Sequence, residues 1–181
     1  MVEETRKIHG DSIEIGRSFA EMKRIHDEGK ICMLHAVEGA HHLGGNIGMV
    51  DELFERGVCH FIVPHLYPNE AGGCCPLMTE DVQVPLPGGF HAKYQDASGV
   101  SEWGRELIEK LLDVGILVDA IHGTREYRRQ VIEIVRNHPK KRPAVLSHVT
   151  VPNYAKSGLN PLPEDIREIA ETGGVVGLMM T

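Results

Sequence analysis

Residues 116–122 read Ile-Leu-Val-Asp-Ala-Ile-His, an apolar run long enough for one buried strand that stops at a histidine. Residues 144–148, Ala-Val-Leu-Ser-His, repeat the pattern, and residues 31–38, Ile-Cys-Met-Leu-His-Ala-Val-Glu, end on a glutamate instead. Each run predicts a short strand that carries a metal-competent side chain at its carboxyl end. In a barrel of parallel strands, the active site lies at that end.

Helices and strands are expected to alternate along the chain. Helical spacing of apolar residues predicts helices at 12–29, 46–56, 101–114, 125–137 and 164–172, and apolar runs predict strands at 31–37, 58–64, 116–121, 143–147 and 175–180. Strict alternation with apolar strands is typical of a parallel sheet that is covered on both faces.

The expected fold class is therefore α/β, a parallel (β/α) barrel of TIM type that is incomplete. About five of eight strands are countable, and a complete barrel typically needs ~250 residues, whereas this chain has 181. Residues 1–181 are interpreted as a single partial barrel domain. Open sheet edges are costly unless they are covered, so a homo-oligomer that covers them is one expected arrangement.

Residues 66–100 hold most of the proline and glycine of the chain and show no clear periodicity. A stretch of this length without regular structure is uncommon in a compact domain and is usually functional. We interpret it as a long loop over the mouth of the site.

Composition limits the partners that we expect. The formal net charge is −7, which argues against nucleic acid, because phosphate binding needs clustered Lys and Arg. No apolar stretch approaches the ~20 residues that span a bilayer, so no membrane partner is expected. Four cysteines without a visible signal peptide or a Cys-x-x-Cys zinc spacing indicate reduced thiols and a cytoplasmic location.

The candidate metal ligands are Glu38, His122 and His148, each of which follows or ends a predicted parallel strand. Taken alone, any one of them is more typically structural, since a histidine can satisfy a buried carbonyl and a glutamate can cap a helix. Three at equivalent strand ends favour a metal site. Two imidazoles and a carboxylate are a common ligand set for Zn²⁺ with a water at the open position, and such a water suits hydrolysis.

Five blocks of sequence carry a family resemblance. They are Val-Glu-Gly-Ala-His at 37–41, the helix start at 99–107, the strand and histidine at 115–122, Ala-Val-Leu-Ser-His at 144–148, and the segment 163–177 that ends in Gly-Gly-Val-Val-Gly. In order and spacing, the chain from about residue 25 to its end resembles the renal (membrane) dipeptidase family of zinc peptidases, a branch of the amidohydrolase-like barrels.

The resemblance implies roles for particular residues. In the family the glutamate matched by Glu38 bridges two zinc ions, and the histidines matched by His122 and His148 bind one of them. His65, in a looser match together with Asn69, would be the catalytic histidine that contacts the scissile region of the substrate. Asn160 stands where the family has a substrate-binding segment, and it is therefore a candidate substrate contact.

The sequence also departs from the family pattern. The family's first-strand His-x-Asp, its last-strand aspartate and its carboxylate-binding arginine have no match. The literal match His9-Gly10-Asp11 lies too close to Glu38 in the chain and is expected to form a surface turn. One zinc ion is therefore expected from this chain, whereas the complete family site holds two.

The function expected from the sequence is that of a metal-dependent, dipeptidase-like hydrolase. It would cleave a peptide or amide bond of a small peptide-like substrate with a zinc-bound water. Two alternatives remain open. One is a catalytically impaired barrel remnant that works as a binding or assembly module, and the other is a metallohydrolase with a non-peptide substrate such as a lactone or phosphoester.

Overall fold

The computed structural model describes residues 2–66, 68–75, 99–150 and 159–179. The helices in these ranges are α1 Val2–His9, α2 Phe19–Asp27, α3 Met49–Glu55, α4 Glu102–Val114, α5 Arg125–Asn137 and α6 Pro163–Glu171, with a 3-10 turn η1 at Ala40–Leu43. The strands are β1 Ile13–Ile15, β2 Ile31–Met33, β3 His35–Glu38, β4 Val58–Ile62, β5 Leu117–Asp119, β6 Ala144–Val149 and β7 Val175–Leu178.

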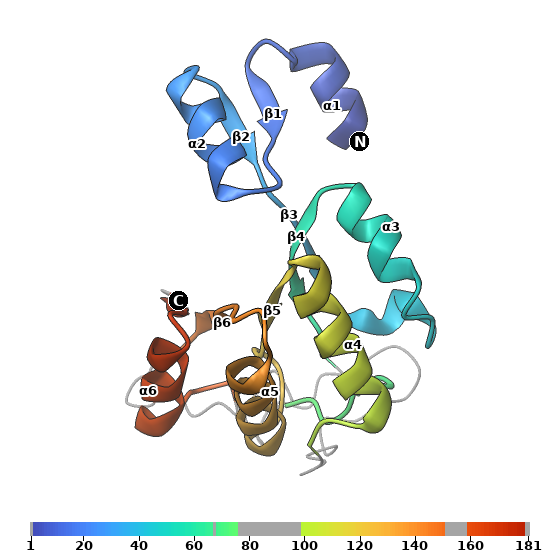
Figure 1. Cartoon of the computed structure of the whole chain (residues 1–181), viewed down its shortest axis with the longest axis vertical. Coiled ribbons are helices and arrows are strands. Elements are labelled where there is room, and N and C mark those ends of the chain that lie inside the picture. Colours follow the sequence, from blue (N-terminus) through green and yellow to red (C-terminus); the bar gives the residue numbers. More distant parts are fainter. Residues whose placement is uncertain (1, 67, 76–98, 151–158, 180–181) are drawn as a thin grey trace.

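The described strands pair in parallel and follow one another in chain order. β3, β4, β5, β6 and β7 form a five-stranded sheet, and β1 pairs with β2 in a two-stranded one. Figure 1 shows the β1–β2 pair, with α1 and α2, extending from one end of the molecule. Parallel strands in sequential order, with helices between them, confirm the predicted barrel fold over part of a barrel.

The predicted strand 31–37 is two strands. Its first half, β2, pairs with β1, and its second half, β3, pairs with β4, with the interruption at Leu34. A single apolar run thus connects the small sheet to the large one.

The amino-terminal part corrects the sequence-based expectation. The predicted helix 12–29 is wrong at its start, because β1 occupies that region and α2 begins only at Phe19. The Ser18 hydroxyl caps α2 by accepting the N–H of Glu21. Phe19 is 75% exposed and Ile15 only 7%, so two residues that looked like one helical stripe belong to different elements. The helix α1 was not predicted.

The His9-Gly10-Asp11 segment lies in an exposed turn between α1 and β1. It stands at the amino end of β1, whereas Glu38 ends its own strand. The expectation that this segment is a surface turn is confirmed.

Helices α3, α4, α5 and α6 lie in chain order along the sheet, each in contact with the next (Figure 1). In α4 the apolar side chains face the core, and the fully buried ones are Leu107, Ile108, Leu111 and Leu112. Ser101 caps the start of this helix, and Gly115, with a left-handed φ of 104°, ends it. The helix-facing strand residues Phe61, Val118 and Leu146 belong to the same core.

The other face of the sheet carries polar side chains. The register aligns Glu38 with Ile62 and Ile62 with Asp119. Aligned residues of parallel strands face the same side, so Glu38 and Asp119 share this inner face.

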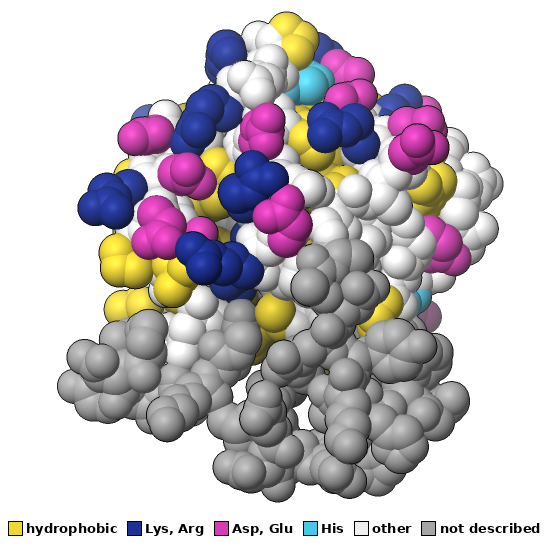
Figure 2. All heavy atoms as spheres, turned by 90° about the horizontal axis from the view of Figure 1, so that it is seen from below, with side chains coloured by type: hydrophobic (Ala, Val, Ile, Leu, Met, Phe, Trp, Pro, Cys, Tyr) yellow, Lys and Arg dark blue, Asp and Glu magenta, His cyan; other side chains and the backbone are white. Residues whose placement is uncertain are grey.

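Charged side chains are mixed on the surface. Figure 2 shows basic and acidic side chains interspersed over the described part of one face, and ion pairs such as Arg125–Glu164 and Arg136–Glu171 connect neighbouring helices. Among the described helices, none combines the length and the apolar character that crossing a bilayer requires.

Candidate metal centre

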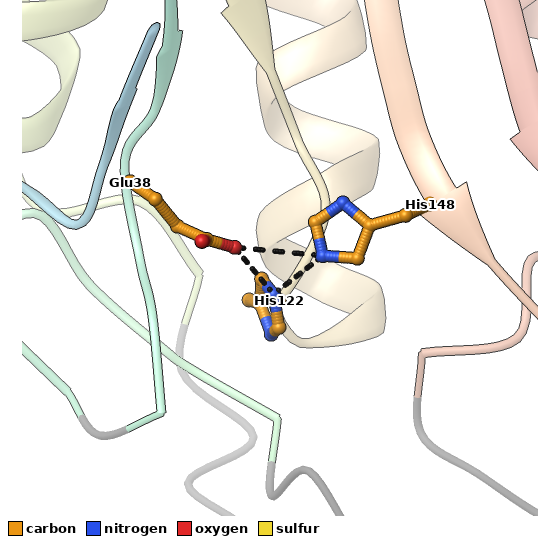
Figure 3. A group of neighbouring side chains, drawn as sticks. All are labelled: Glu38, His122 and His148. Carbon is orange, nitrogen blue, oxygen red and sulfur yellow. Dashed lines mark hydrogen bonds and ion pairs between the residues drawn. The ribbon is translucent and has the colours of Figure 1, made fainter. Parts of the chain in front are cut away.

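The three predicted metal ligands come from the carboxyl ends of three strands. Glu38 is the last residue of β3, His122 follows β5, and His148 is the penultimate residue of β6. Figure 3 shows their side chains pointing toward one another from separate strands. Parallel pairing thus brings together residues that are far apart in the sequence.

The donor atoms have the spacing of a coordination shell. Oε1 of Glu38 lies 3.2 Å from Nε2 of His122 and 3.5 Å from Nε2 of His148, and the two Nε2 atoms are 3.0 Å apart. Ligands at ~2.0–2.1 Å from a tetrahedral Zn²⁺ are separated by about 3.3 Å. The three donors therefore match one triangular face of such a tetrahedron, and no other group of this kind gathers within the described ranges.

His122 reaches the cluster through an uncommon backbone conformation. Its φ is +64°, in the left-handed region that costs a residue with a Cβ roughly 1–2 kcal/mol. Two hydrogen bonds hold the turn: the His122 carbonyl accepts the Cys75 N–H at 2.6 Å, and the Gly123 carbonyl accepts the Cys75 thiol at 3.1 Å. The segment around Cys75 thus fixes the position of His122.

Cys75 belongs to the predicted loop 66–100. The described parts of that loop pair with each other at Gly72 and Val100, and Cys74 pairs with Gly123 beside the site. Residues 67 and 76–98 lie outside the described residues, so the predicted cover over the site stays a prediction.

His148 is aimed by an irregularity in β6. Between Leu146 and Val149, β6 has one residue more than the paired stretch of β7. An extra residue of this kind changes the direction of the side chains around it. The Ser147 hydroxyl lies 2.7 Å from Nδ1 of His148, which leaves Nε2 for the cluster, as in metal-binding histidines whose second nitrogen is hydrogen-bonded.

The electrostatics favour neutral imidazoles. Burial lowers the pKa of His122 to about 4, with the neighbouring His65 and His148 contributing and Glu38 opposing the shift. Burial also lowers the pKa of His65. A metal binds the neutral form of histidine, so His122 is ready to bind near pH 7 without losing a proton.

His65 lies next to the cluster. Its Nε2 is 3.4 Å from Oε1 of Glu38, and its ring meets that of His122 edge-on with 4.7 Å between the centroids. The side chain is partly exposed. The geometry places the predicted catalytic histidine beside the predicted metal ligands, and its role stays a prediction.

The two predicted substrate contacts have structural partners. The Asn69 side chain donates to the Val63 carbonyl and accepts the Ala71 N–H, at 2.8 and 2.9 Å. The Asn160 carbonyl accepts Nη2 of Arg128 at 3.3 Å. Substrate binding by either asparagine stays a prediction.

Sequence reasoning missed a hydrogen-bonded group next to the candidate ligands, formed by Asp119, His60 and Ser147. Nε2 of His60 lies 2.9 Å from Oδ2 of Asp119, and this carboxylate is fully buried. The signal in the sequence was Asp119 itself, a charged residue inside an apolar strand. An aspartate is almost never fully buried unless it is paired, so a buried partner could have been expected.

Comparison with known families agrees with this geometry. The sequence pattern of the family described as membrane dipeptidase (Peptidase family M19) matches residues 1–181. The chain belongs to this family. The predicted resemblance is thereby confirmed.

Relatives in the family are distant in sequence. Dipeptidase verJ of Clonostachys rogersoniana is 23% identical over 93% of this chain. The solved structure of the probable dipeptidase PvdM from Pseudomonas aeruginosa superposes on 97% of the chain with a TM-score of 0.81 at 20% identity. The structure of a metallo peptidase from Rhodobacter sphaeroides, liganded with a phosphinate mimic of the dipeptide L-Ala-D-Ala, superposes on 98% of this chain with a TM-score of 0.76 at 20% identity.

The chain spans less than half the length of these relatives. It covers 38% of dipeptidase verJ, 40% of PvdM and 46% of the Rhodobacter protein. The structural likeness therefore establishes the shared fold, and the activity is a matter of proposal.

The depressed pKa of His122 predicts a pH-dependent stability of the metal-free chain. Between an ordinary pKa of ~6.5 and the folded value of about 4, the unfolded chain binds a proton that the folded chain does not. The folded chain is therefore fully stable above pH ~6.5 and is destabilised as the pH falls toward 4, because protonation of His122 favours the unfolded chain. The free energy of unfolding should be about 2 kcal/mol lower at pH ~5 than at pH ~7.5. Urea unfolding with a chelator present measures it.

The variant His122→Asn should lose this part of the pH dependence. His26→Asn, which changes a histidine whose side chain is 86% exposed, is the matched control and should retain it. An unchanged pH dependence in His122→Asn would contradict the assignment.

Proposed function

We propose that this chain is a metal-dependent hydrolase of the dipeptidase type, with one Zn²⁺ held by Glu38, His122 and His148. The observation that carries the proposal is the convergence of their donor atoms, at 3.0 to 3.5 Å from one another. Two neutral imidazoles and a carboxylate with an open fourth position are the ligand set of a catalytic zinc site. A bound Zn²⁺ would polarise a carbonyl and lower the pKa of a water to ~7.

The residues proposed to hold the ion differ in their exposure. Side chains of Glu38 and His148 are 41% and 32% exposed, whereas His122 is 2% exposed. His122 is thus the buried member of the proposed ligand set, whereas Glu38 and His148 are partly open. An incoming carbonyl would approach the ion from the side of these two residues.

His65 is proposed to act on the carbonyl oxygen of the scissile bond. Its lowered pKa keeps the imidazole neutral near pH 7, so it can donate one N–H while negative charge develops on the oxygen. Its Nε2 lies 3.4 Å from Oε1 of Glu38, so this donor stands beside the proposed metal ligands. Removing a donor of this kind typically costs ~10²–10³-fold in kcat.

The proposed substrate is a small peptide. Support comes from family membership and from the Rhodobacter relative, whose structure holds a dipeptide mimic. Asn69 and Asn160 are proposed to line the substrate position, Asn69 from the segment that follows His65 and Asn160 from the segment that precedes α6.

Zinc binding tests the proposed ligands. We expect about one Zn²⁺ per chain, and Glu38→Gln and His148→Ala should each weaken the affinity by roughly 100-fold or more, since even residues behind the ligands are worth 10–100-fold. Titration against a chromophoric chelator measures it, with His26→Ala as the matched control on an exposed helix. A wild-type chain that binds no zinc would refute the site.

Hydrolysis tests the role of His65. Free dipeptides, L-Ala-D-Ala among them, should be cleaved by the zinc-loaded chain, and His65→Ala should reduce kcat by ~10²-fold while zinc stoichiometry stays at the wild-type value. Release of free amino groups is the readout. Turnover of a phosphoester or lactone but of no dipeptide would assign the site to another substrate class.

A second function, self-association, is favoured by a separate observation. Apolar side chains are exposed on β7, the edge strand of the five-stranded sheet: Val175 is 64% exposed and Leu178 65%. Apolar surface of this kind on sheet edges is a template for pairing with another chain. We propose that a second copy of this chain covers them.

Light scattering tests the self-association. The wild-type chain should have a mass above that of one protomer, and Leu178→Lys should return it toward the monomer because a charge opposes edge pairing. Ile166→Lys alters a residue of α6 that is 45% exposed and serves as the control. A wild-type monomer at all concentrations would exclude this function.

A further inference from the structure

The end of β5 contains a buried carboxylate that the proposed chemistry does not use. Asp119 is 0% exposed, and its oxygens accept three hydrogen bonds. The Ile121 N–H donates to Oδ1 at 2.9 Å, Nε2 of His60 donates to Oδ2 at 2.9 Å, and the Ser147 N–H lies 3.2 Å from Oδ2 and 3.4 Å from Oδ1.

Two of these donors precede proposed metal ligands. Ile121 is the residue before His122, and Ser147 is the residue before His148. One carboxylate therefore joins the backbone of the β5 turn to the backbone of β6 directly behind the two imidazoles. Nε2 atoms of the two histidines are 3.0 Å apart, so a small shift of either strand end would change the spacing of the donors.

The Ser147 N–H needs an acceptor that the regular pairing of β5 with β6 does not supply. Strand β5 ends at Asp119, and its last register pair with β6 is Asp119 with Val145. The Ser147 N–H lies beyond that pair, in the interval where β6 has its extra residue. The side chain of Asp119 takes the place of the next strand carbonyl and lets the irregular segment persist.

Folding alone gives a weak reason for a charge here. Burying a carboxylate is costly even when it is hydrogen-bonded, and a well-packed apolar residue often serves stability as well or better. His60 supplies the third hydrogen bond to the Asp119 carboxylate, and its own side chain is 23% exposed on the inner face of the sheet. The arrangement is the one expected of a support for ligands.

We propose that Asp119 is a positioning residue of the metal centre, with His60 as the partner that orients its carboxylate. It sets the distance between His122 and His148 through their preceding backbone N–H groups and touches neither the metal nor the substrate. This inference rests on the proposed metal site. Groups behind metal ligands are typically worth 10–100-fold in metal affinity.

The experiment compares Zn²⁺ affinity with the stability of the metal-free chain in three variants. Asp119→Leu removes all three acceptor contacts, Asp119→Asn keeps one carbonyl acceptor, and His60→Leu removes the orienting partner. We expect the Zn²⁺ dissociation constant to rise by 10–100-fold in Asp119→Leu, and by less in the other two. Asp51→Asn, at a carboxylate that is 57% exposed, is the control and should bind as the wild type does.

Visible absorption of the Co²⁺-loaded chain is a second readout. A change in band position or intensity in the Asp119 variants would report altered ligand geometry, which a purely structural residue would not produce in the folded fraction. If Asp119→Leu fails to fold, Asp119→Asn and His60→Leu decide the matter. Affinities within about twofold of the wild type in all folded variants would overturn the inference, whereas a wild type without zinc affinity would refute the metal site itself.

Discussion

Parallel pairing of β3 through β6 is the constraint on which the site depends. Side chains separated by 84 and 26 positions in the chain, at Glu38, His122 and His148, meet because their strands end at one edge of one sheet. The helices on the opposite face fill the core and fix the strands in this register. A slip of one residue would turn one of these side chains to the other face of the sheet, so the geometry of the candidate metal centre depends on this pairing.

Two local departures from regular structure complete the geometry. The left-handed backbone of His122 and the extra residue in β6 each redirect a histidine toward Glu38. Both are unfavourable in isolation and are held by neighbouring groups: the Cys75 segment on one side and the Asp119 carboxylate on the other. Strain held by surrounding structure is characteristic of functional sites. Burial of His122 lowers the pKa of its imidazole, so the ring is neutral near pH 7 and keeps a nitrogen lone pair for a cation.

The sequence predicted the repeating part of this architecture well. Apolar runs that end in Glu38, His122 and His148 located the strand ends, and parallel pairing then required those ends to meet. Prediction failed where local pattern was ambiguous: Ile15 and Phe19 stand at helical spacing but belong to a strand and to the start of a helix. It also failed where the decisive contact is long-range. Nothing local to Asp119 indicates that its partners are His60 and Ser147, because those contacts exist only after the strands have paired.

The most direct test of the account is X-ray absorption spectroscopy at the zinc edge of the loaded chain. The account predicts a first shell of nitrogen and oxygen donors at ~2.0–2.1 Å, with the outer-shell scattering of two imidazole rings from His122 and His148. A spectrum without imidazole scattering, or one dominated by sulfur at ~2.3 Å from the cysteines, would contradict it.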